Sequence, residues 1–164
     1  MDILLSESDI YHVWYTLLKF VHVLAAVVAV GSNITYGVWL VRGSRDPKML
    51  SFALRGVKLL DDRMANPSYG ILLVTGILMV LIGGISIATS WLIVALILYV
   101  AVVLLGLLGY TPALKRQIQL LKTKGAASAE YKAASQRGTV IGVVLGVFVV
   151  LIIFLMVFKP IFWS

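Results

Sequence analysis

Four apolar stretches constrain this chain more than any other feature of its sequence. A helix needs about 20 mostly apolar residues to cross the hydrocarbon core of a bilayer. The stretches run over about 13–41, 67–87, 91–110 and 139–158. Of the 164 residues, 61% are hydrophobic and 13% are charged, whereas soluble domains have about 45–50% and about 25%. We therefore expect one all-α domain over residues 1–164, an integral membrane four-helix bundle embedded in the lipid bilayer.

The basic residues are concentrated in the first and third of the three loops. These loops hold twelve of the fourteen lysines and arginines: Arg42, Arg45, Lys48, Arg55, Lys58, Arg63, Lys115, Arg116, Lys122, Lys124, Lys132 and Arg137. The positive-inside rule places both loops in the cytoplasm and both termini outside. We attribute the net charge of +7 to topology and to anionic lipid. Nucleic acid is not an expected partner, because no soluble module interleaves basic and aromatic residues.

The N-terminus and the loops add four expectations. Acidic Asp2, Glu7 and Asp9 precede the first stretch, unlike the basic start of a signal peptide, so this stretch should remain as an anchor. The short link GGISIATSW predicts a tight helical hairpin. Loop one, DPKMLSFALRGVKLLDDRMANP, predicts an amphipathic helix on the cytoplasmic leaflet. Loop three predicts that the third helix continues to about Lys124, breaks at Gly125 and resumes before the fourth stretch.

One side of the first stretch is polar. At 100° per residue, five polar residues share a face about 100° wide, with small residues between them: Tyr15, Lys19, His22, Asn33 and Tyr36. Polar groups that face hydrocarbon are costly, so this face should point into the bundle. The residues are either hydrogen-bonded contacts between helices or a ligand site.

His22 is the candidate metal ligand, because a neutral imidazole binds haem iron, copper or zinc. The second histidine, His12, would lie about 15 Å away along one helix, too far to share an ion. Two arrangements stay open: a five-coordinate haem b with His22 as its axial ligand, or a dimer that supplies a second His22. The apolar stretches contain no Asp or Glu, which argues against transport of a hard cation. The absence of cysteine excludes thiolate ligands.

Two further patterns lie outside this face. Gly138, Gly142 and Gly146 are spaced by four residues, which lets helix backbones approach closely, either within the bundle or in a homo-oligomer. Near the start of the second stretch, acidic residues suit a solvated helix N-terminus, although a functional role is an alternative. That cluster comprises Asp61, Asp62, Arg63 and Asn66.

Three segments resemble a family of predicted four-helix integral membrane proteins of the bacterial inner membrane, whose function is unknown: LLKFVHVLAAVVAVGSN, RMANPSYGILLVTGIL and YTPALKR. More distantly, the spacing of Lys19, His22 and Gly31 is similar to span one of the HemJ-type protoporphyrinogen oxidases and the copper-resistance D proteins. The HemJ-type resemblance implies that His22 ligates haem b. The essential span-three lysine of that family has no counterpart, because residues 91–110 contain neither lysine nor histidine.

These observations give three functional hypotheses. The first is a non-enzymatic membrane protein whose polar site around His22 binds haem b or a small lipophilic ligand. The second is a structural or accessory subunit of a larger membrane complex, packed through the glycine face of the fourth stretch. The third is a HemJ-like membrane oxidoreductase. No HExxH, P-loop, GxGxxG or Ser-His-Asp pattern supports a different enzyme.

Overall fold

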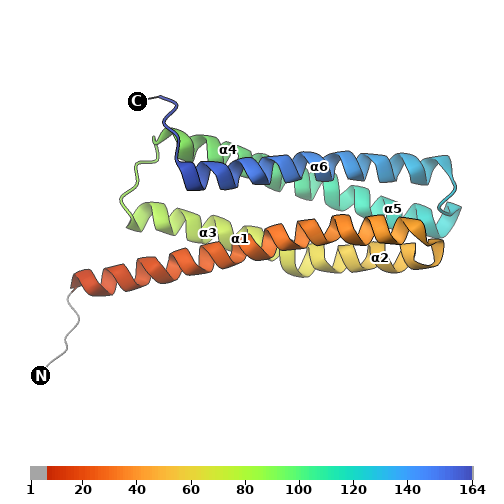
Figure 1. Cartoon of the computed structure of the whole chain (residues 1–164), viewed down its shortest axis with the longest axis horizontal. Coiled ribbons are helices and arrows are strands. Elements are labelled where there is room, and N and C mark those ends of the chain that lie inside the picture. Colours follow the sequence, from red (N-terminus) through yellow and green to blue (C-terminus); the bar gives the residue numbers. More distant parts are fainter. Residues whose placement is uncertain (1–6, 164) are drawn as a thin grey trace, which may run out of the picture.

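The structure is a computed structural model that describes residues 7–163. In this range the chain forms four long helical rods, connected in sequence and antiparallel to their neighbours (Figure 1). The rods are α1 (Glu7–Arg45); α2 (Pro47–Leu60), η1 (Asp61–Ala65) and α3 (Asn66–Ile82); α4 (Ser90–Leu104), η2 (Leu105–Tyr110) and α5 (Thr111–Lys124); and α6 (Ala129–Phe158). All four rods are long and apolar enough to cross a membrane. The predicted all-α membrane bundle is confirmed.

The rods are longer than a bilayer requires. The 39 residues of α1 extend over about 58 Å at about 1.5 Å per residue, about twice the thickness of the hydrocarbon core. All four rods therefore continue into the segments that carry the basic loops, residues 42–66 and 111–138, which we call the basic end. The third loop follows its prediction: α5 ends at Lys124, Gly125 has a φ of 80°, and α6 begins at Ala129.

Two prolines lie inside rods rather than at their ends. Pro67 and Pro112 each follow a π-helical turn, η1 and η2. Proline has no N–H and its ring crowds the preceding turn, and the wider π turn relieves this crowding. The third rod therefore continues through Thr111 and Pro112 beyond the predicted membrane span, in agreement with the predicted extension of this helix to about Lys124. The second rod ends at Ile82 instead of about residue 87, because Gly83 and Gly84 follow and Gly84 has a φ of 60°.

The amphipathic helix of loop one exists, but its predicted position on the membrane surface is wrong. The Asp46 side chain caps α2 by accepting a 2.9 Å hydrogen bond from the Lys48 N–H. The helix then folds back along α1 and also packs against α5, with Leu54 and Val57 fully buried. This close approach depends on Gly43 of α1, because a Cβ there would lie 2.5 Å from the Cβ of Ala53. The face of α2 that carries Leu50, Leu54 and Val57 is thus covered by protein, whereas Met49, Phe52 and Leu59 remain exposed.

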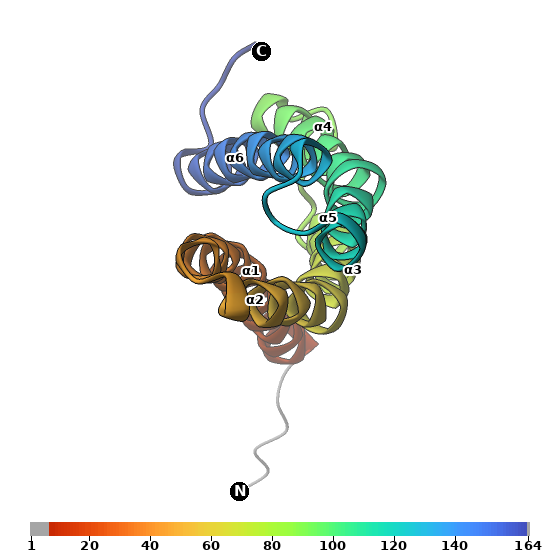
Figure 2. The same ribbon diagram turned by 90° about the vertical axis from the view of Figure 1, so that its right-hand side faces the viewer.

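The rods associate in two pairs. The first rod packs against the second, and α6 packs against the third, while α2 and α5 join the two pairs at the basic end (Figure 2). The core that unites them lies at this end and comprises Tyr36, Leu50, Leu54, Val57, Ala65, Tyr110, Leu114 and Tyr131. Towards the opposite end, most outward side chains are large and apolar, as expected for contact with lipid.

Candidate functional site

The polar face of α1 points at the second rod. Three contacts define the antiparallel register: Tyr15 lies against Gly83, His22 against Thr75 and Gly43 against Ala53. In each pair the two residue numbers add up to between 96 and 98. This register divides the five polar residues of α1 between two places along the interface.

The first place, which we call the histidine site, comprises Tyr15, Lys19, His22 and Thr75. The Nδ1 atom of His22 lies 2.8 Å from Oγ1 of Thr75. The Thr75 hydroxyl is 2.6 Å from the Ile71 carbonyl and donates its single proton there. It must then accept a proton from Nδ1–H, which fixes the imidazole tautomer and leaves the lone pair on Nε2.

Glycines make room for the aromatic rings of this site. A Cβ at Gly76 would lie 3.3 Å from Cε1 of His22, and a Cβ at Gly83 would lie 2.9 Å from Cε2 of Tyr15. One turn from His22, the Lys19 ammonium lies 5.1 Å from the centroid of the Tyr15 ring, close enough for a cation–π interaction. The site therefore combines an oriented imidazole with a cation at its open side, since Lys19 is exposed.

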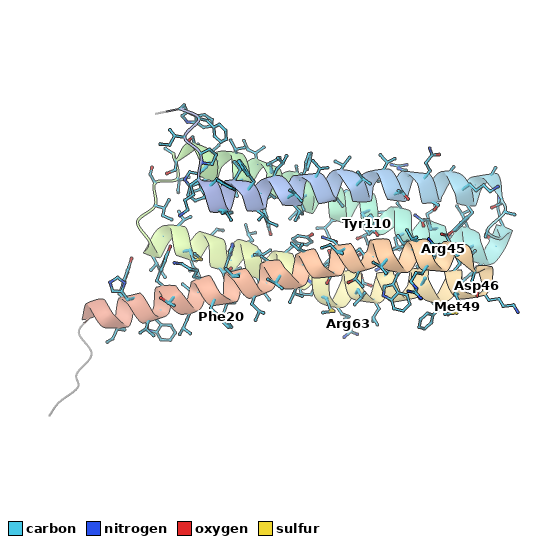
Figure 3. All side chains as sticks on the ribbon, viewed as in Figure 1. Phe20, Arg45, Asp46, Met49, Arg63 and Tyr110 are labelled. Carbon is cyan, nitrogen blue, oxygen red and sulfur yellow. The ribbon has the colours of Figure 1, made fainter. Side chains whose placement is uncertain are left out.

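The second place, which we call the tyrosine site, lies where the two pairs of rods meet. Asn33 donates a 2.6 Å hydrogen bond to the Tyr69 hydroxyl, and the Tyr99 hydroxyl donates to the Tyr69 carbonyl. The rings of Tyr36 and Tyr110 stack with centroids 6.1 Å apart. Figure 3 shows Tyr110 within the bundle, whereas Arg63 points outwards. The site is completed by a 2.9 Å hydrogen bond that Thr111, the first residue of α5, donates to Asp61 of η1.

The two sites are separate. His22 and Asn33 are eleven residues apart, which corresponds to about 16 Å along a helix. Between them the face that meets the second rod contains buried Ala25 and Ala29, which carry no polar side-chain atom. Asn33 and Tyr36 therefore do not gather around His22, and the polar face of α1 is not one continuous site.

Sequence reasoning missed most of the partners in these sites. Thr75 looked like any threonine of an apolar helix, and Asp61 looked like part of a solvated helix start. One signal was present: each π turn is adjacent to a motif singled out in the sequence, RMANPSYG and YTPALKR. Asp61 belongs to the cluster that the sequence singled out, with a functional role as an alternative. The missed residues are Tyr69, Thr75, Tyr99, Tyr110 and Thr111.

The glycines of α6 are in unequal surroundings. A Cβ at Gly138 would lie 2.3 Å from Nε2 of Gln117, and one at Gly142 would lie 3.6 Å from Tyr110, whereas Gly146 has no neighbour within 4 Å. Two of the three glycines thus contact other helices of the same chain. Only Gly146 is left for a partner in the accessory-subunit hypothesis.

The possible ligands of a metal are also limited. Among residues 7–163, no three His, Cys, Asp or Glu side chains come together in a way that could hold a metal ion. A metal at His22 would therefore need its other ligands from a porphyrin or from a second chain.

Four membrane-crossing helices, with polar contacts enclosed between them, define an integral membrane protein. Residues 16–160 match the family described as predicted integral membrane protein (DUF2269), and the chain belongs to that family. Comparisons with curated proteins and with solved structures found no significant match.

Proposed function

We propose that this chain is a non-enzymatic membrane protein that binds haem b through Nε2 of His22. One observation carries the proposal: the Thr75 hydroxyl, which donates to the Ile71 carbonyl, holds Nδ1 of His22 as a donor. Histidines that ligate metals usually donate their other ring N–H to an oxygen in this way, which fixes the tautomer and the ring orientation. Bound haem would supply an iron centre for ligand binding or electron transfer.

The remaining residues of the histidine site suit the edge of a haem. The porphyrin ring of haem is large and apolar, and the residues of α1 around His22 are also mostly apolar. The two carboxylates of haem require a cation or water as a partner. Lys19 lies one turn from His22 and is exposed, so its ammonium is placed to pair with a carboxylate near the membrane surface. Another small lipophilic anion would use the same lysine but would not require the imidazole.

An absorption spectrum of the detergent-purified protein tests this proposal, with haem supplied during expression and spectra taken before and after dithionite. A Soret band at about one haem per chain is expected. His22→Ala should abolish it, whereas His12→Ala, which removes the other histidine, should retain it. A colourless wild-type protein, or equal Soret bands in both variants, would overturn the haem proposal. Binding of a lipophilic anion that survives His22→Ala and is lost in Lys19→Ala would favour the alternative ligand.

We also propose that the basic end faces the cytoplasm of a bacterial cell, with both termini outside. The asymmetry of lysine and arginine between the loops supports this orientation. The chain has no cysteine, so single cysteines give an unambiguous label. In intact cells a membrane-impermeant maleimide should label Ala88→Cys, and it should label Ala127→Cys only after permeabilisation. The reverse pattern would contradict the proposed orientation.

A further inference from the structure

Asp61 is a buried carboxylate without a cationic partner. It is 5% exposed, and within residues 7–163 no salt bridge involves it, because the nearby Lys58 pairs with Asp62 instead. Its Oδ2 atom accepts the hydrogen bond from Thr111. The side chain of Asn66 also interacts with this carboxylate. Neutral partners such as Thr111 and Asn66 compensate only part of the cost of removing a carboxylate from water.

A buried group without a hydrogen-bond partner lies at the same level of the bundle. Tyr36 is 4% exposed, and its hydroxyl has no hydrogen-bond partner among the described residues. The register of α1 against the second rod places Tyr36 opposite Asp61. Contacts with the third rod also show that Tyr36 and Asp61 lie at the same height in the bundle. Tyr110 stacks on Tyr36, and the next residue, Thr111, donates a hydrogen bond to Asp61. A buried oxygen donor or acceptor left unpaired costs free energy comparable to a lost hydrogen bond.

The positive charges of the protein near Asp61 do not pair with it, although Lys58 attracts it electrostatically. On the same rod, Lys58 is paired with Asp62, and Arg63 is exposed and points outwards (Figure 3). The titratable side chains that face Asp61 from the neighbouring elements are all phenols: Tyr36 from α1, Tyr69 from α3 and Tyr110 from η2. A cation that pairs directly with Asp61 would therefore come from solution.

We propose that Asp61 and Tyr36 form a binding site for one monovalent cation, a proton or Na⁺, held between the carboxylate and the phenol. A single carboxylate balances a single positive charge, and Thr111 and the nearby phenols offer oxygen, the ligand that hard cations prefer. A divalent ion would require further carboxylates. The site is distinct from the histidine site, since Tyr36 is fourteen residues from His22, about 21 Å along the helix.

Thermal unfolding of the purified protein in detergent tests the site. The temperature midpoint is measured while Na⁺ replaces choline at constant ionic strength, and again while the pH is varied at constant Na⁺. A cation that binds only the folded state raises the midpoint as its concentration rises. Asp61→Asn should remove this dependence. The matched control is Asp62→Asn, which removes an exposed, ion-paired neighbour and should retain it.

The Na⁺ series and the pH series together identify the cation. A midpoint that rises with Na⁺ at fixed pH assigns the site to an alkali ion, and one that responds to pH alone assigns it to a proton. Tyr36→Phe keeps the stacked ring and removes only the hydroxyl, so it should weaken cation binding by about tenfold, as expected for one hydrogen bond to a charged group. This variant also tests the site if Asp61→Asn does not fold.

Three results would overturn the proposal. The first is a wild-type midpoint that is insensitive to both Na⁺ and pH. The second is the same dependence in Asp61→Asn as in the wild type. The third is Tyr36→Phe binding the cation as tightly as the wild type does. None of these measurements uses haem, so they are independent of the function proposed for His22.

Discussion

Replacing Gly43 with alanine tests whether the close contact between α1 and α2 stabilises the first pair of rods. The new Cβ would lie 2.5 Å from the Cβ of Ala53 and 3.5 Å from the Cα of Leu50. Carbon atoms in favourable contact are about 3.5–4.0 Å apart, so the two helices would have to separate by about 1 Å. The Ala53 methyl cannot rotate away, because it is bonded directly to the backbone.

The expected loss of stability follows from two opposing effects. Overpacking of this kind costs about 1–3 kcal/mol. Alanine in place of glycine in a helix contributes about 1 kcal/mol in the opposite direction. Gly37→Ala is the matched control, because Gly37 lies in the same helix, is exposed, and has no neighbour within 4 Å. The helix contribution is common to both variants, so Gly43→Ala should be less stable than Gly37→Ala by about 1–3 kcal/mol.

Reversible unfolding in mixed micelles, with increasing SDS and helix content followed by circular dichroism, measures this difference. A size-exclusion profile before unfolding checks that both variants remain folded. Equal free energies of unfolding for the two variants would refute the reasoning, because they would mean that α1 and α2 do not approach as closely as the structure shows.

Two further predictions use the same unfolding measurement. Gly138→Ala should lose about 1–2 kcal/mol, since its Cβ would displace the buried, hydrogen-bonded amide of Gln117, whereas Gly146→Ala should be neutral or more stable by up to about 1 kcal/mol; equal losses would contradict the packing. Asn33→Leu and Tyr69→Phe should each lose about 0.6–2 kcal/mol, and the double variant should lose no more than the worse single one, because both remove the same hydrogen bond. Losses that simply add would show that the two side chains act separately.

The number and order of the helices could be predicted from the sequence because burial in lipid requires long apolar runs. The direction of the polar face could be predicted as well: α1 is a single α-helix from Glu7 to Arg45, so a rotation of 100° per residue holds along its whole length. That is why Tyr15, His22, Asn33 and Tyr36 all lie against partners in other rods or elements.

The partners themselves could not be predicted. Hydrophobic pattern does not specify which rods pair, and Asn33 could have bonded to any helix that offered a hydroxyl. The burial of Asp61 could not be predicted either, because its charged neighbours Asp62 and Arg63 are typical of a solvated segment. The structure shows these two neighbours exposed. Asp61 is buried by groups that are distant in the sequence, among them Thr111, fifty residues later in the chain, which donates a hydrogen bond to it.

The π turn η1 has a consequence for how this sequence can change in length. A π turn contains one residue more than the α turn that it replaces, and one residue corresponds to about 100° of rotation in an α-helix. Deleting one residue between 61 and 65 would leave a rod that is equally apolar and almost as long. With α2 held in place, that deletion would convert the π turn into an α turn, and Tyr69 and Thr75 would still face α1. A deletion within α3, between Pro67 and Thr75, has no wider turn to absorb it and would rotate Thr75 by about 100° away from His22. The second rod can therefore lose a residue at η1, but losing one within the first half of α3 would separate the two partners of the histidine site.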